Sequence, residues 1–201
     1  SPDYVKAETC LAKACELETE SGDYYVRFAD LKESYKSYDD ARILYLKALK
    51  VEETNFEALK SMGLYELRVS RILDKAKEYF EKAKAQQPDD KTINMHLAEL
   101  YFEEGNLEDA LISVNLALTK EFNEDVTNIL IKILFALGNR KDGLKVFDSL
   151  INKRPDNPGY RLDFAERLFQ SNVYAEAAIQ FKKGFDLLGE DNLPTDLVKK
   201  F

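Results

Sequence analysis

Residues 91–119 decide the fold and read KTINMHLAELYFEEGNLEDALISVNLALT. Small and large apolar residues recur with helical spacing on both sides of one turn, at Leu97, Ala98, Tyr101, Leu107, Ala110, Val114 and Ala117. In the turn, Gly105 can adopt the left-handed conformation that ends a helix, and Asn106 can cap the next one. This stretch is therefore predicted to form two helices that pack against each other in antiparallel orientation.

The same pattern repeats along the chain at intervals of 33 to 35 residues. A small residue opens each predicted second helix, at Ala7, Ala41, Ala76, Ala110, Gly143 and Ala177. A large apolar residue follows four positions later, at Leu11, Tyr45, Phe80, Val114, Phe147 and Phe181. Residues four apart lie on one helical face, so the small residue admits a neighbouring helix and the large one fills the adjoining space. The chain is therefore predicted to be a tandem array of helix pairs.

The predicted helices cover residues 4–18, 23–34, 38–50, 55–68, 72–86, 90–103, 107–119, 124–136, 140–152, 158–170 and 174–188, with a short further helix near Pro194. They form one array over residues 1–201, made of a lone second helix at 4–18, full repeats at 22–54, 55–89, 90–122, 123–156 and 157–190, and a capping or truncated helix at 191–201. The second repeat has one extra residue in its turn, near Arg68–Arg71. Isolated helices of these lengths are marginal in water, so stability must come from stacking on neighbours.

The repeat resembles the tetratricopeptide repeat (TPR) family in its length, its two helices, its small residue opening the second helix and its closing Pro at Pro88 and Pro155. The resemblance covers about residues 5–188. It implies an all-α fold, a right-handed α-solenoid (superhelix) of about five repeats preceded by a lone N-terminal helix. The chain departs from the family pattern in having no Trp, and Tyr25 and Leu59 stand where the family often places one.

Composition excludes several classes of function. The formal net charge is -8, which disfavours a nucleic-acid binder, since such a protein needs a basic face. The longest apolar run, 129–137, is broken by Lys132 and is too short to span a bilayer, so we expect no membrane insertion. No feature identifies a compartment. The cytoplasm is the default expectation, and a periplasmic location stays open because the chain begins at Ser1 without Met.

The sequence shows no catalytic or metal-binding pattern. His96 is the only histidine, and it is expected to be a surface or groove side chain. Cys10 and Cys15 are five positions apart on one predicted helix, so they should point to different faces and serve as packing or surface thiols. No phosphate-binding Gly loop or nucleophile elbow occurs. We therefore expect a chain without cofactor, metal or enzymatic activity.

The resemblance implies that the first helix of each pair lines a concave groove. Repeat one would contribute Val26, Arg27, Asp30 and Glu33, and the later repeats would contribute Lys60, Leu64, Leu67, Arg68, Met95, His96, Glu99, Phe102, Glu103, Asn128, Ile129, Lys132, Phe135, Leu162, Asp163, Glu166 and Phe169. This set is rich in acidic groups, and Phe102, Phe135 and Phe169 recur at intervals of 33 and 34 residues.

Two interpretations of these residues stay open. They could bind a protein or peptide segment that carries apolar anchors and basic residues, as in a scaffold or adaptor. Alternatively, the three Phe residues pack against the next repeat, and the acidic groups are a solvated face. A further alternative is a structural subunit that assembles through its ends or convex face. The sequence leaves the oligomeric state unknown.

Overall fold

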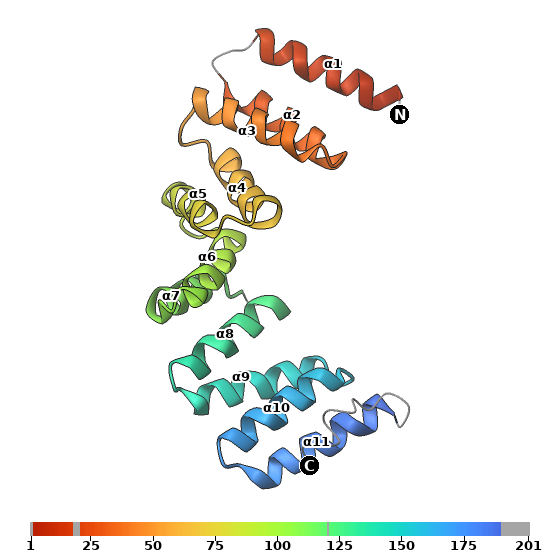
Figure 1. Cartoon of the computed structure of the whole chain (residues 1–201), viewed down its shortest axis with the longest axis vertical. Coiled ribbons are helices and arrows are strands. Elements are labelled where there is room, and N and C mark those ends of the chain that lie inside the picture. The colour runs from red at the N-terminus through yellow and green to blue at the C-terminus, as the bar shows by residue number, and fades with distance from the viewer. Residues whose placement is uncertain (1, 18–20, 120, 190–201) are drawn as a thin grey trace. The chain divides into compact units, whose positions relative to one another are not determined.

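The computed structural model describes residues 2–17, 21–119 and 121–189, and in this part of the chain all regular structure is helical. The helices follow in the order α1 (Pro2–Leu17), α2 (Gly22–Ser34), α3 (Tyr38–Val51), α4 (Phe56–Tyr65), η1 (Glu66–Ser70), α5 (Leu73–Gln86), α6 (Lys91–Glu103), α7 (Leu107–Ala117), α8 (Glu124–Ala136), α9 (Arg140–Lys153), α10 (Pro158–Gln170) and α11 (Tyr174–Leu188) (Figure 1). Their positions confirm the predicted helices, except that the α-helix predicted at 55–68 ends at Tyr65. The predicted helix at 191–201 lies outside the described residues. Within those residues no helix is long and apolar enough to cross a membrane.

The chain divides into two compact units, Ser1–Ala117 and Leu118–Phe201. In the first unit consecutive helices pair as α2 with α3, α4 with α5 and α6 with α7, and each pair also contacts the next through α3 with α4 and α5 with α6 (Figure 1). The lone helix α1 packs on α2, as expected for a second helix without its own partner. Lys32 of α2 forms an ion pair with Glu8 of α1. The one array predicted over 1–201 stays a prediction.

The core of the first unit consists of the small and large residues that define the repeat. Ala41, Tyr45 and Ala48 are at most 1% exposed on α3, and Ala76, Phe80 and Ala83 are fully buried on α5. On α4, Gly63 lies against Phe80, and an ideal Cβ at Gly63 would come within 2.5 Å of the ring atom Cε1. The repeat therefore needs glycine here because the aromatic ring lies where a side chain would begin.

The second unit uses the same packing, with the bulkier Ile131 and Leu150 at two of the small positions. Helices α8 and α9 form one pair, α10 and α11 form the next, and α9 contacts α10. Its core gathers Ile131, Phe147, Leu150, Ile151, Phe164, Leu168 and Ala177. The Phe147 and Phe164 rings stack with their centroids 5.1 Å apart, which joins α9 to α10.

One backbone position ends the first helix of every full repeat in the left-handed conformation. It is occupied by Lys36, Arg71, Gly105, Gly138 and Asn172, whose φ angles lie between 59° and 79°. Only glycine adopts this conformation without a steric cost from Cβ. Lys36 and Arg71 therefore carry backbone strain that Gly105 and Gly138 avoid.

Arg71→Gly is expected to raise the free energy of unfolding by about 0.5–1 kcal/mol, because relief of the left-handed strain exceeds the entropy that glycine adds to the unfolded chain. Urea denaturation followed by circular dichroism measures this gain. The matched control is Lys75→Gly, at an exposed helical position of α5, which should lose about 1 kcal/mol. Equal losses in both variants would contradict the assignment of strain to Arg71.

The sequence placed the extra residue of the second repeat in the turn between its two helices. In the structure this residue does not lengthen the turn. The predicted α-helix at 55–68 instead ends at Tyr65 and continues as the π-helical segment η1, Glu66–Ser70. A π-helical turn closes its hydrogen bonds over one more residue than an α-helical turn, so it absorbs a single insertion without breaking the helix. Such turns are frequent at functional sites.

Candidate binding surface

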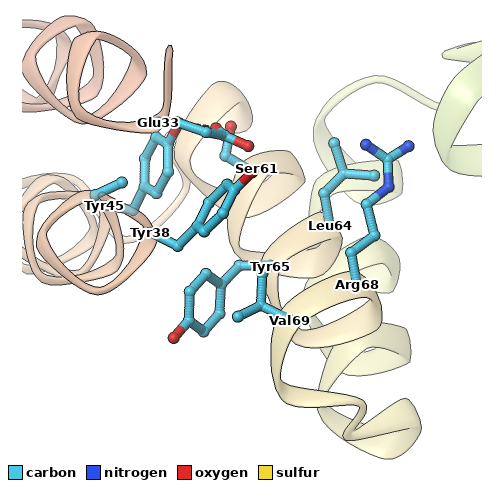
Figure 2. Close-up of a pocket in the computed structure, with 9 residues that line it drawn as sticks. Glu33, Tyr38, Tyr45, Ser61, Leu64, Tyr65, Arg68 and Val69 are labelled. Carbon is cyan, nitrogen blue, oxygen red and sulfur yellow. Dashed lines mark hydrogen bonds between the residues drawn. The ribbon is translucent and has the colours of Figure 1, made fainter. Parts of the chain in front are cut away.

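A pocket of about 240 Å³ lies in the first unit, between the end of α2, the start of α3 and the helix α4 with its continuation η1 (Figure 2). It is lined by Glu33, Tyr38, Ala41, Tyr45, Ser61, Leu64, Tyr65, Arg68 and Val69. Three of these, Glu33, Leu64 and Arg68, are among the residues expected to line the groove. Arg68 and Val69 belong to η1, so the inserted residue shapes one wall of the pocket.

Tyr45 links the pocket to two carboxylates on α2. Its hydroxyl lies 2.7 Å from Asp30 Oδ1 and 2.9 Å from Glu33 Oε2, and Tyr45 is 1% exposed. Burial raises the pKa of Tyr45 far above its ordinary value, and the Asp30 carboxylate raises it further. Tyr45 is therefore a neutral donor at every physiological pH.

The predicted groove residues on α6 are partly accessible on one face of the helix. Met95 and Phe102, seven residues apart, are half-buried, while Glu99 and Glu103 are exposed. Leu67 is half-buried on η1 beside the exposed Arg68. These side chains give the first unit a mixed apolar and charged surface.

His96 and Ile129 do not have the exposure that the sequence suggested. His96 is 6% exposed and stacks on Phe80 with ring centroids 5.5 Å apart, and Ile129 is 3% exposed. For His96 the physical reason is that α6 contacts both α5 and α7, so its buried arc is wider than the single apolar face expected of an isolated pair. The expectation that these two side chains are exposed in a groove is wrong.

The predicted groove residues of the second unit differ in their environment. Phe135 packs against α9, since an ideal Cβ at Gly143 would lie 2.8 Å from its ring, and the Arg167 guanidinium lies 4.6 Å from its centroid. Phe169 is 49% exposed and meets Tyr174 edge to face. Asn128 donates to the Tyr160 hydroxyl at 3.1 Å and is half-buried, as is Leu162, which lies against Gly184. The exposed charged side chains are Lys132, Asp163 and Glu166.

Lys60, another predicted groove residue, joins two repeats. Its ammonium lies 2.9 Å from Asp90 Oδ2, and Asp90 Oδ1 caps α6 by accepting the Ile93 N–H at 2.8 Å. Burial alone would raise the pKa of Asp90, but the Ile93 N–H and the Lys60 ammonium outweigh it and hold the pKa below its usual range. Ionised Asp90 therefore stabilises the junction between α4 and α6.

Asp90→Asn is expected to lower the free energy of unfolding by about 1 kcal/mol at neutral pH, because asparagine keeps the cap but not the ion pair. A carboxyl whose pKa is depressed by folding contributes its full stability above the unfolded value. That contribution is lost as the pH falls through the folded-state pKa, which lies below the ordinary pKa of an aspartate. Urea denaturation should therefore find the difference constant from pH 7 to pH 5 and decreasing at more acidic pH. Asp89→Asn, at the exposed neighbouring residue, should change stability by less than Asp90→Asn.

The two cysteines lie in different environments, and neither belongs to a group of three potential metal ligands in the described residues. Cys10 is exposed and Cys15 is buried, and both are free thiols, which confirms that they point to different faces. Across residues 2–17, 21–119 and 121–189, no three His, Cys, Asp or Glu side chains are placed to hold a metal ion.

Sequence analysis missed the aromatic part of the pocket. Tyr38 and Tyr65 were assigned no role, and Tyr45 was assigned only to the core. The one signal that could have indicated the site was the extra residue near Arg68–Arg71, because an insertion inside a helix displaces the side chains that follow it.

Comparison with known proteins identifies the repeat. Residues 73–133, from α5 to α8, match the family model of the tetratricopeptide repeat. No curated protein matches the chain in sequence. Among solved structures, YrrB, described as a TPR protein with an unusual peptide-binding site, is 20% identical with a TM-score of 0.84, over 95% of this chain and 98% of its own.

Two structures of MamA are also similar. One is 18% identical with a TM-score of 0.73, over 85% of this chain and 93% of its own. The other, of MamA AMB-1, is 19% identical with a TM-score of 0.72, over 89% and 96%. At these identities the structural likeness establishes the fold. The chain therefore carries tetratricopeptide repeat sequence over residues 73–133 and has the all-α fold of tetratricopeptide repeat proteins.

Proposed function

We propose that this chain is a non-catalytic scaffold or adaptor that binds an extended segment of a partner protein on the first helices of its repeats and the adjoining part of α3. In the first unit the binding surface consists of the pocket in Figure 2 and the accessible face of α6, with Met95 and Phe102. The observation that carries the proposal is the pocket itself, because it combines aromatic, apolar and charged walls on helices that the repeat presents side by side.

The dimensions of the pocket favour a side chain of a partner over a small molecule. Its volume of about 240 Å³ lies below the roughly 300–1,000 Å³ of typical small-molecule and cofactor sites. Peptides are commonly held by shallow sites that receive alternate side chains, while the backbone runs along the surface. YrrB is described as having a peptide-binding site, and the shared fold supports the same class of ligand for this chain.

The half-buried side chains supply the apolar contacts of the proposed surface. Aromatic and Met residues are enriched where protein partners bind, because they bury a large area for few rotatable bonds or adapt to irregular shapes. In the second unit, taken by itself, the exposed residues among those predicted to line the groove are Lys132, Asp163, Glu166 and Phe169. Its acidic groups suit a partner that carries basic residues beside its apolar anchors.

The experiment begins with selection of binding peptides from a random phage-displayed library. The affinity of a selected peptide is then measured by calorimetry for the wild type and for the double variant Met95→Glu/Phe102→Glu. The matched control is Ile43→Glu/Ile112→Glu, at residues 51% and 56% exposed on the second helices α3 and α7. The proposal predicts a loss of about tenfold or more in the first variant only. It is wrong if the control loses affinity and the α6 variant keeps it, with both variants folded by circular dichroism.

A further inference from the structure

We infer that the pocket at α2, α3, α4 and η1 receives an arginine side chain of the partner segment, with the guanidinium bound by Glu33, which lines the pocket, and by Asp30, which contacts the same Tyr45 hydroxyl. This inference rests on the proposed function and names the chemistry of the partner at one position. Three observations support it: the carboxylates that share a single donor, the surrounding tyrosines and the place of Arg68.

The Tyr45 hydroxyl contacts both carboxylates, and both are exposed to solvent. A phenol has one proton, so Tyr45 can donate to Asp30 or to Glu33 but not to both at once. Within the described part of the chain, neither carboxylate has a basic side chain within the 4.0 Å of an ion pair. Asp30 and Glu33 are three positions apart on α2 and meet at the same phenol, so their charges reinforce each other. A ligand with several N–H donors would satisfy both.

The walls of the pocket match a planar cation. Tyr38 is 39% exposed and lines the pocket with Leu64. Tyr65 also lines it and is half-buried, and its ring already has the Arg42 guanidinium 5.7 Å from its centroid. A guanidinium is attracted to the face of a tyrosine ring within about 6 Å, and it is less strongly hydrated than an ammonium. Its fork of donors can bind carboxylates in bidentate fashion, whereas its aliphatic stem can contact Leu64.

Arg68 lies far enough along the pocket to leave the acidic end available. In Figure 2, Ser61 and Leu64 separate it from Glu33. Arg68 is exposed and forms no ion pair with Glu33. The pocket is therefore acidic at the α2 end and basic at the η1 end. A partner arginine would orient its guanidinium toward α2, and this fixes the direction of the side chain.

The decisive experiment compares an arginine with citrulline, its neutral isostere. A peptide selected from the random library is synthesised with each residue at the position where arginine is enriched. Calorimetry then measures both peptides against the wild type and against Asp30→Asn/Glu33→Gln, which keeps the oxygen atoms that Tyr45 contacts. Glu108→Gln, an exposed residue on α7 of the same unit, removes charge away from the pocket.

The inference predicts that citrulline costs about tenfold or more in affinity for the wild type and for Glu108→Gln, and almost nothing for Asp30→Asn/Glu33→Gln. It is overturned if the selected peptides depend on Met95 and Phe102 but show no preference for arginine, or if citrulline binds equally well. In that case the proposed function stands while the occupant of the pocket is different.

A second measurement keeps the inference testable if no peptide is selected. N-acetyl-arginine amide is titrated into isotopically labelled protein, and the amide resonances are followed by NMR. Saturable shifts at Glu33, Ser61 and Leu64, absent with the citrulline analogue and in Asp30→Asn/Glu33→Gln, would support the pocket on its own. No shifts, or equal shifts with N-acetyl-leucine amide, would overturn it.

Discussion

Phe80→Ala is expected to lower the free energy of unfolding by about 3–5 kcal/mol, the largest effect of any substitution considered for this chain. Phe80 is fully buried and packs in a core with Leu59, Ala76, Ala83, Ile93, Leu97 and Leu100. Its ring joins three helices, because it belongs to α5, covers Gly63 of α4 and stacks on His96 of α6. Removing it leaves a cavity at the junction of two repeats.

Urea denaturation of the purified chain measures this loss. The matched control is Ile43→Ala, which truncates a 51% exposed side chain on α3 and should change stability by no more than about 0.5 kcal/mol. A loss in Phe80→Ala that is no larger than in the control would mean that the repeats are not held together through this ring.

Gly63→Ala is expected to lower the free energy of unfolding by about 1–3 kcal/mol, although alanine is the better helix former. The added Cβ would come within 2.5 Å of Phe80 Cε1, 2.6 Å of Cδ1 and 2.9 Å of Cζ. A whole ring face cannot move aside as the end of a flexible side chain can. The helices α4 and α5 must therefore separate.

Introducing Gly63→Ala into the Phe80→Ala variant tests whether the clash with the ring causes the loss of stability. Without the ring the clash is gone, and the change from Gly to Ala should become neutral or stabilise by up to about 1 kcal/mol. The two substitutions should thus be strongly non-additive in a double-mutant cycle. Additive losses would show that Gly63 is required for a reason other than its contact with Phe80.

The fold could be predicted because the same pattern of packing residues recurs in several repeats of the sequence. The recurring small residues, such as Ala76 and Ala110, and the large residues four positions later form the observed cores. The ends of the first helices α6 and α8 could also be predicted, from Gly105 and Gly138, whose φ angles are positive. The same conformation at Lys36 and Arg71 could not be predicted, because neither residue type favours it.

The candidate site was predicted less completely because burial depends on two neighbours at once. A register on one helix places His96 beside Met95 in the groove, but the Phe80 ring of the adjacent helix covers it. The pocket depends on η1, whose effect on the following side chains cannot be derived from spacing. Tyr45 illustrates the same limit, because its ring is buried in the core while its hydroxyl contacts the exposed carboxylates of Asp30 and Glu33.

The most direct test of the proposed function maps where a selected peptide binds. The peptide carries a nitroxide spin label, and the broadening of backbone amide signals is measured by NMR along the first unit. The proposed function predicts strong broadening on α4, η1 and α6, centred on Leu64, Arg68 and Met95, with α3 and α7 little affected around Ile43 and Ile112. Broadening confined to the exposed faces of α3 and α7 would contradict it and would place partner binding on the second helices.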